Sequence, residues 1–286
     1  MKKVILLLCG LMLLANNNKL FAQDNRQEVY DKINIPNKKP IPYPPVREAD
    51  VMWAKIIWRI IDLREKVNLP LYYPTQPIDN RYNLVSLLLK GIDTEGLTAY
   101  DAQDERNEFK VKLTKDAIDV VMGKEQKTIK VQDSSGNVTE KNVEGQREIE
   151  QVKQIMVKEK WFFDKNNSTM EVRILGLCPL RIYNRLDDSG NPPTDEIRKK
   201  KTFWIYYPDY RDLLSRHEVF NRNNDAQQIS YDDYFVQRRF NSYIFQESNA
   251  YDNRSITSYA TGVDAMYESE KIKKYLFETE HDLWEY

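Results

Sequence analysis

The apolar positions of this chain recur with two different spacings, which predict a mixture of helices and strands. In residues 50–69, DVMWAKIIWRIIDLREKVNL, they fall three and four positions apart behind Asp50, a residue type that favours helix starts. We therefore expect a helix here, and its wide apolar stripe indicates a buried anchor of the core. Similar patterns predict a helix from Asn83 to about Gly91 and another from Thr114 to Gly123.

Alternating apolar and polar positions predict strands in the middle of the chain. Residues 127–143 read as two strands around a polar turn, and residues 160–177 read as a hairpin whose turn is DKNNS. Pro179 is expected to interrupt the second strand of that hairpin before LRIYN. Residues 147–160, REIEQVKQIMVKEK, carry apolar side chains at helical spacing and predict a further helix.

The last third of the chain returns to helical patterns. A strand, TFWIYY, precedes a helix from Pro208 to Arg216. A second helix is expected over residues 230–247, SYDDYFVQRRFNSYIFQE, because Asp233 stands three residues after Ser230 in a capping-box pattern. Residues 263–286 read as a closing helix. Since helices and strands do not alternate strictly, we predict an α+β fold in which helices pack on a small, mainly antiparallel sheet.

The first 49 residues differ from the rest and predict two segments before the folded part. Residues 1–22 combine Lys2 and Lys3, an apolar run and an LFA exit, which is the layout of a secretory signal peptide. Residues 23–49 contain five prolines, which favour extended backbone. They form either a disordered linker or an extended arm laid on a partner. Residues 50–286 are then expected to form a single α+β domain.

Charge and cysteine content exclude some classes of protein. Removing the 22-residue signal from the 286-residue chain takes away Lys2, Lys3 and Lys19, so the net charge changes from −1 to −4. Electrostatic binding of nucleic acid needs a basic surplus, and we expect none. The remaining chain holds one cysteine, Cys178, so it cannot form an internal disulfide. The apolar run of the signal is too short to span a membrane, and the rest of the chain has no run of that length.

The search for catalytic or metal-binding residues finds incomplete patterns. HEVFN begins like the zinc signature H-E-x-x-H, but Asn221 stands where the second histidine belongs. The loop that begins at Asp133 resembles a calcium loop, yet Val138 replaces the required glycine. Cys178 lies in an apolar strand and is expected to be buried and inert. We therefore expect no catalytic residue, no metal and no cofactor.

Residues 204–221, WIYYPDYRDLLSRHEVFN, concentrate the side chains that anchor protein–protein interfaces. We expect about half of these residues to belong to the core instead, with their hydroxyl or indole N–H groups hydrogen-bonded. A second class of function, an envelope hydrolase, would use Asp209, Asp212 or Glu218. The expected partner-contacting residues lie in this segment and in the arm: Tyr206, Tyr207, Tyr210, Arg211, Phe220, Pro40, Pro42, Tyr43 and Pro44.

Three long segments resemble one family. Residues 50–74, 159–179 and 203–254 are similar to the gliding-motility family GldN, also called PorN, of the type IX secretion system of the Bacteroidetes. The resemblance implies a non-enzymatic periplasmic scaffold on the inner side of the outer membrane. It also implies partners: a homo-oligomeric ring built with the lipoprotein GldK (PorK) and connected to the motor proteins GldL and GldM.

Overall fold

A computed structural model describes residues 33–78, 81–104, 108–124, 126–132, 138–184, 197–221, 223–224 and 226–283. The chain divides into two compact units, Met1–Asn34 and Ile35–Tyr286. The predicted signal peptide and the first ten residues of the predicted arm lie outside the described residues.

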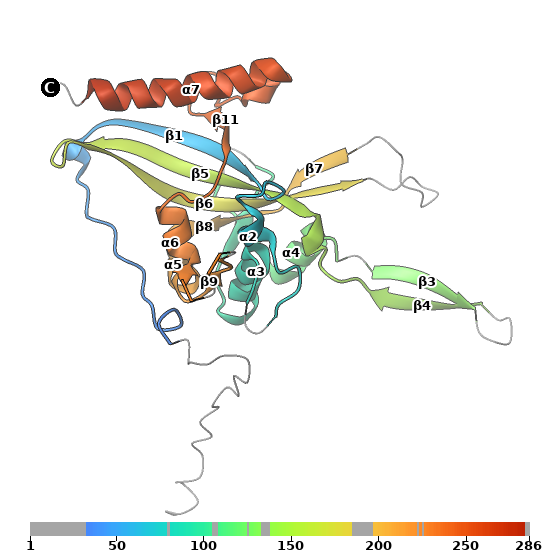
Figure 1. Ribbon diagram of the computed structural model, residues 1–286. Coiled ribbons are helices and arrows are strands. Elements are labelled where there is room, and N and C mark those ends of the chain that lie inside the picture. The colour runs from blue at the N-terminus through green and yellow to red at the C-terminus, as the bar shows by residue number, and fades with distance from the viewer. Residues whose placement is uncertain are drawn as a thin grey trace, which may run out of the picture. The chain divides into compact units, whose positions relative to one another are not determined.

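Seven antiparallel strands form the main sheet (Figure 1). β11 (Tyr243–Glu247), β1 (Val51–Asp62), β5 (Val152–Asp164), β6 (Thr169–Asn184), β8 (Phe203–Tyr206) and β2 (Ala99–Asp101) follow one another in this order, and β7 (Ile197–Lys201) pairs with β6. The long central strands β1, β5 and β6 pair along most of their length. Two smaller pairs join β9 (Glu218–Val219) to β10 (Ile229–Ser230) and β3 (Gln126–Gln132) to β4 (Val138–Glu144). The predicted α+β class is confirmed.

Two predicted helices are strands, and the reason is burial on both faces. The helix expected over residues 50–69 is β1, followed by the short α2 (Leu69–Tyr72). Residues 57–61 of β1 are all buried and, except for Arg59, apolar, so the apolar side chains do not alternate and mimic helical spacing. The helix expected over residues 147–160 is likewise wrong: a short 3-10 turn, η3 (Ile149–Gln151), leads into β5.

The other predicted helices form close to their expected positions. They are α3 (Leu84–Thr94), α4 (Lys115–Val121), α5 (Tyr207–Ser215), α6 (Tyr231–Val236) and α7 (Val263–Asp282). The side chains of Asn83, Thr114 and Ser230 each accept a hydrogen bond from a backbone N–H at the start of α3, α4 and α6. However, α6 ends at Val236, and residues 243–247, expected to follow it as helix, form β11 instead.

Three apolar clusters hold the elements together. The largest packs α3, α5 and α6 against β5 and β8, with Leu88, Val157 and Phe235 among its members. A second gathers around Trp58 and Trp204. In the third, α7 packs on β1 and β11 through Ile272 and Leu276. Figure 1 shows α7 lying along the side of the sheet where β11 and β1 are found.

A buried ion cluster lies where α6 leads back to the sheet. Glu159 of β5 is fully buried and pairs with Arg59 of β1 at 3.2 Å and with Arg238 at 2.9 Å. The indole of Trp161 donates a further hydrogen bond to the same carboxylate at 3.0 Å. Because each charge has a partner, this burial is compatible with a stable fold.

β6 runs without interruption through the proline that was expected to end it. The carbonyl of Pro179 accepts hydrogen bonds from the backbone N–H and the hydroxyl of Thr202, at 3.0 and 2.7 Å. Accepting these bonds does not require the N–H that proline lacks, so the strand continues. Nearby, a Cβ on Gly176 would lie 2.6 Å from the carbonyl oxygen of Ile205, so β8 approaches β6 closely only because this residue has no side chain.

Candidate functional site

Tyr207 and Tyr210 belong to the core, contrary to the expectation that they contact a partner. α5 starts directly after β8, which carries both rings into the largest apolar cluster and leaves neither exposed. Burial raises the pKa of both phenols, so both hydroxyls stay protonated and donate hydrogen bonds. Tyr207 donates to Asp232 at 2.8 Å, and Tyr210 donates to the carbonyl of Thr98 at 3.3 Å.

Arg211, one helical turn after Tyr207, lies at the boundary between the core and the arm. Its guanidinium makes two hydrogen bonds to Asp232 on α6, both 3.0 Å long. Both side chains are buried, with 7% of Arg211 and 4% of Asp232 exposed. The Nη2 atom of Arg211 also donates to the carbonyl of Ile41 in the arm, at 2.7 Å. One buried ion pair therefore presents a donor to the arm.

The arm is held by side chains that bond to its backbone carbonyls. Ser215 donates to the carbonyl of Lys38 at 2.9 Å, Arg211 to that of Ile41, and Arg173 of β6 to that of Pro44 at 2.6 Å. We call Ser215, Arg211 and Arg173 the cradle. The accepted carbonyls are three residues apart. A polyproline II chain has three residues per turn, so such carbonyls lie on one side of it.

Side chains of the arm add a second layer of contacts. The ring of Tyr43 lies 4.0 Å from the guanidinium of Arg211 and 5.1 Å from that of Arg173, within the range of cation–π attraction. Lys38 forms an ion pair with Asp233 of α6. Among the described arm residues only Ile35 is buried. The arm is thus attached through polar contacts rather than through the apolar core.

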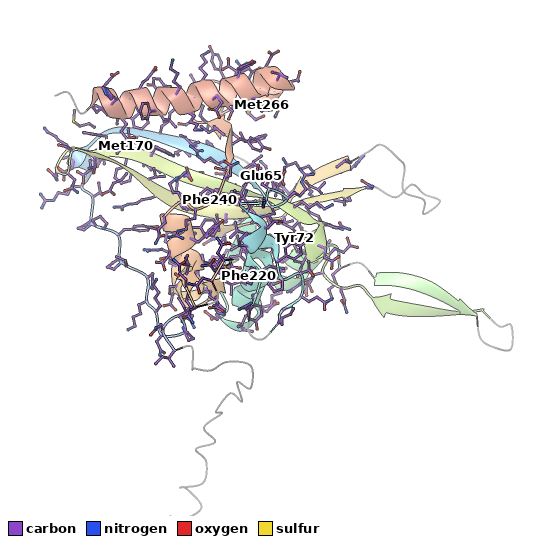
Figure 2. The ribbon with its side chains drawn as sticks, in the orientation of Figure 1. Glu65, Tyr72, Met170, Phe220, Phe240 and Met266 are labelled. Carbon is purple, nitrogen blue, oxygen red and sulfur yellow. The ribbon has the colours of Figure 1, made fainter. Side chains whose placement is uncertain are left out.

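The other predicted interface residues keep accessible surface. Tyr206, Pro40 and Tyr43 are half-buried, and Pro42 and Pro44 are exposed. Phe220, which is labelled in Figure 2, follows β9 and has 40% of its surface exposed. Their contact with a partner stays a prediction.

The three carboxylates proposed for a hydrolase lie on α5 and in β9. Asp209 and Asp212 are exposed on α5, where Asp212 pairs with Arg216 at 3.0 Å. Glu218 lies in β9 and pairs with Arg81 at 3.5 Å. Two hollows formed by described residues, one beside α2 and one beside α7, are lined by none of the three. The geometry therefore gives the hydrolase hypothesis no support.

His217 and Cys178 have structural surroundings. The Nδ1 of His217 lies 3.0 Å from the carbonyl of Leu213 and its Nε2 lies 3.3 Å from the Lys90 amine, which fits a neutral ring. Burial and the charges of Lys90 and Arg216 lower the pKa of His217. Burial raises the pKa of the Cys178 thiol to about 12. Within the described residues, no three His, Cys, Asp or Glu side chains are grouped so as to hold a metal ion.

Sequence reasoning missed Asp232, Ser215 and Arg173. The pair Asp232-Asp233 reads as an ordinary acidic surface pair, although Asp232 is almost fully buried. Arg173 lies in β6 whereas the rest of the cradle lies on α5, and no local spacing links residue 173 to residue 211. The three prolines at positions 40, 42 and 44 were the available signal that the arm is extended.

Comparison with known families gives one match that covers most of the chain. The model of a family described as gliding motility associated protein GldN matches residues 46–285, from just before β1 to the end of the described chain and two residues beyond. No curated protein matches the chain. Among the described residues, none of the helices has the length and apolarity that crossing a membrane requires.

Proposed function

The chain belongs to the GldN family of gliding motility associated proteins, and we propose that it acts as a non-enzymatic scaffold subunit in the periplasm. Family membership makes it a component of the gliding and type IX secretion machinery. The observation that carries the proposal is the extent of the match, which includes every strand of the main sheet.

The proposed assembly is a ring on the inner side of the outer membrane. In it, copies of this chain would alternate with or contact a GldK-type lipoprotein, and the ring would meet GldL- and GldM-type motor proteins. Two features support a scaffold role: neither hollow among the described residues is lined by Asp209, Asp212 or Glu218, and the arm lies along the domain surface with its prolines accessible. Repeated head-to-tail contacts close a ring when the rotation between neighbours divides a full turn.

Purification of the tagged chain from envelopes tests the scaffold proposal. The tag is placed after Tyr286, the bound chains are identified by mass spectrometry, and the particles are imaged in negative stain. Rings that contain a co-purified lipoprotein are the expected result. A matched control carries the same tag on an unrelated exported protein, to identify chains that bind the tag.

Two results would contradict the proposal. A monomer in the periplasmic fraction, without rings or a specific partner, would contradict the scaffold proposal. A chain recovered from the cytoplasm would contradict the proposed location and the signal peptide predicted for residues 1–22.

A further inference from the structure

We infer that the cradle is an exchange site, which in the assembled ring holds the arm of a neighbouring copy, residues 35–47, in place of the copy's own arm. This inference rests on the proposed function, because it requires copies of the chain to be adjacent. It assigns to Ser215, Arg211 and Arg173 the role of joining one subunit to the next.

The cradle bonds to backbone groups that every copy of the arm carries in the same order. Its three donors bind the carbonyls of Lys38, Ile41 and Pro44. A neighbour's arm offers the same carbonyls and the same Tyr43 ring to the two guanidinium groups. The contacts made within one copy and between two copies are therefore equivalent, which is the condition for exchanging an identical element between subunits.

The arm can leave its own domain without opening the core. Ile35 is its one buried residue among those described, and the remaining contacts are hydrogen bonds, ion pairs and ring contacts at the surface. The arm joins β1 through a single 3-10 turn, η2 (Glu48–Asp50), in which no residue is buried. A change of backbone direction at this turn would send the arm to another copy while β1 stays in the sheet.

Two members of the cradle, Arg211 and Ser215, have hydrogen-bond partners within the domain itself. Arg211 is fixed by two hydrogen bonds to Asp232, and Asp232 is fixed in turn by the hydroxyl of Tyr207. The single hydroxyl proton of Ser215 is shared between the carbonyl of Lys38 and that of Asp212 within α5, so Asp212 remains as an acceptor when the arm leaves. Since these partners belong to the domain, this part of the site is organised in advance for an incoming chain.

Within a single copy, the arm is tethered close to its cradle and competes with any other occupant. In a ring this competition changes, because each copy that gives up its arm receives one from its neighbour. The number of arm contacts is conserved, and each exchanged arm links two subunits in a fixed head-to-tail direction. A second copy is therefore a better match than an unrelated proline-rich segment, which would have to displace a tethered arm without such an exchange.

Crosslinking between two marked versions of the full chain tests the exchange. One version carries Lys39→Cys in the arm, and the other carries Asp212→Cys on α5. The two positions were chosen because the hydroxyl of Ser215 contacts both the carbonyl of Lys38, next to Lys39, and the carbonyl of Asp212. Both positions are exposed, and Asp212→Cys removes only the surface ion pair with Arg216. The versions carry different tags, are co-expressed in cells without the unmodified chain, and are treated with a short bismaleimide in intact envelopes. Cys178 is fully buried with a raised thiol pKa, so it does not react.

Exchange predicts a crosslinked pair that contains one chain of each tag. A matched control pairs Lys39→Cys with Lys271→Cys, an exposed position on α7, and we expect at least tenfold less product from it. A chain that carries both Lys39→Cys and Asp212→Cys measures how much arm stays on its own domain.

Three results would overturn the inference. Crosslinking confined to the doubly substituted chain, in rings that assemble normally, would show that the arm stays in place while the scaffold proposal stands. A Lys39→Cys chain joined to a different protein through the arm, with no pair between copies, would assign the arm to another partner. If no assembly forms and no pair appears, both the inference and the proposed function are wrong.

Discussion

At the residue scale, Asp232 connects the core to the arm. Its carboxylate accepts hydrogen bonds from the hydroxyl of Tyr207 and from the Nε and Nη2 atoms of Arg211. Arg211 in turn donates to the carbonyl of Ile41. The neighbouring Asp233 differs in kind, since its carboxylate accepts the hydroxyl of Ser230, the residue that caps α6, and pairs with Lys38 near the surface. Two adjacent carboxylates thus have separate roles, one internal and one at the arm.

This difference predicts unequal losses of stability. Asp232→Asn leaves the buried Arg211 charge without its partner, which is expected to lower the free energy of unfolding by about 3–5 kcal/mol. Asp233→Asn, the matched control, removes a partly exposed pair and should lower it by at most about 1 kcal/mol. Urea unfolding followed by tryptophan fluorescence measures both. Equal losses in the two variants would contradict the assignment.

A second prediction at this scale concerns pH. Burial lowers the pKa of His217 below its value in the unfolded chain, about 6.5. Below that pH the unfolded chain binds a proton that the folded chain binds less readily, so the free energy of unfolding should fall as the pH is lowered from about 7 to about 5. The hydrogen bond from Arg64 lowers the pKa of Asp62 to about 2. The stability that this carboxylate contributes is therefore lost only below the pH range of the experiment.

His217→Gln should flatten this pH dependence, measured as urea midpoints at several pH values. His281 is the chain's only other histidine and lies exposed near the end of α7, so His281→Gln serves as the control. A slope that is removed by the His281 variant instead would rule out His217 as its source.

At the scale of elements, local signals in the sequence predicted caps and turns correctly but failed where burial is two-sided. Asn83, Thr114 and Ser230 act through neighbouring residues, and each starts its helix as predicted. β1 and β5 are flanked by strands and covered on both faces, which depends on segments far away in the chain. Periodicity alone cannot distinguish such a strand from a buried helix. The cradle was missed for the same reason, since it joins β6 to α5.

α7 offers a matched test of which face packs on the sheet. Leu276 is buried against the cluster of Ile57, Ile244 and Ile272, whereas Phe277 has 68% of its surface exposed. Leu276→Ala should lower the free energy of unfolding by roughly 2–5 kcal/mol, because it leaves a cavity. Phe277→Ala should change it by no more than about 0.5 kcal/mol. Thermal and urea unfolding of the two variants checks the orientation of the helix, and a reversed order would contradict it.

At the scale of the whole molecule, the domain and its arm have different roles. The clusters that join the sheet to its helices are formed by residues of the chain from β1 to α7 and include no residue of the arm. The arm adds polar contacts on the outside, through groups that can bind it in one copy or in two. Folding and assembly should therefore be separable by changing the arm alone.

Deletion of residues 23–47 tests this separation. The shortened chain should unfold in one cooperative transition, with the melting temperature lowered by roughly 5–10 °C for the loss of Ile35 and the cradle contacts. Ring assembly, measured by sedimentation and negative stain, should be strongly reduced.

A second chain that keeps the length of the arm but replaces residues 35–47 by glycine and serine separates the effect of the contacts from that of the tether. It should assemble as poorly as the deletion. Normal assembly of either chain would show that the arm does not join subunits, and a deletion that fails to fold would place the arm in the core.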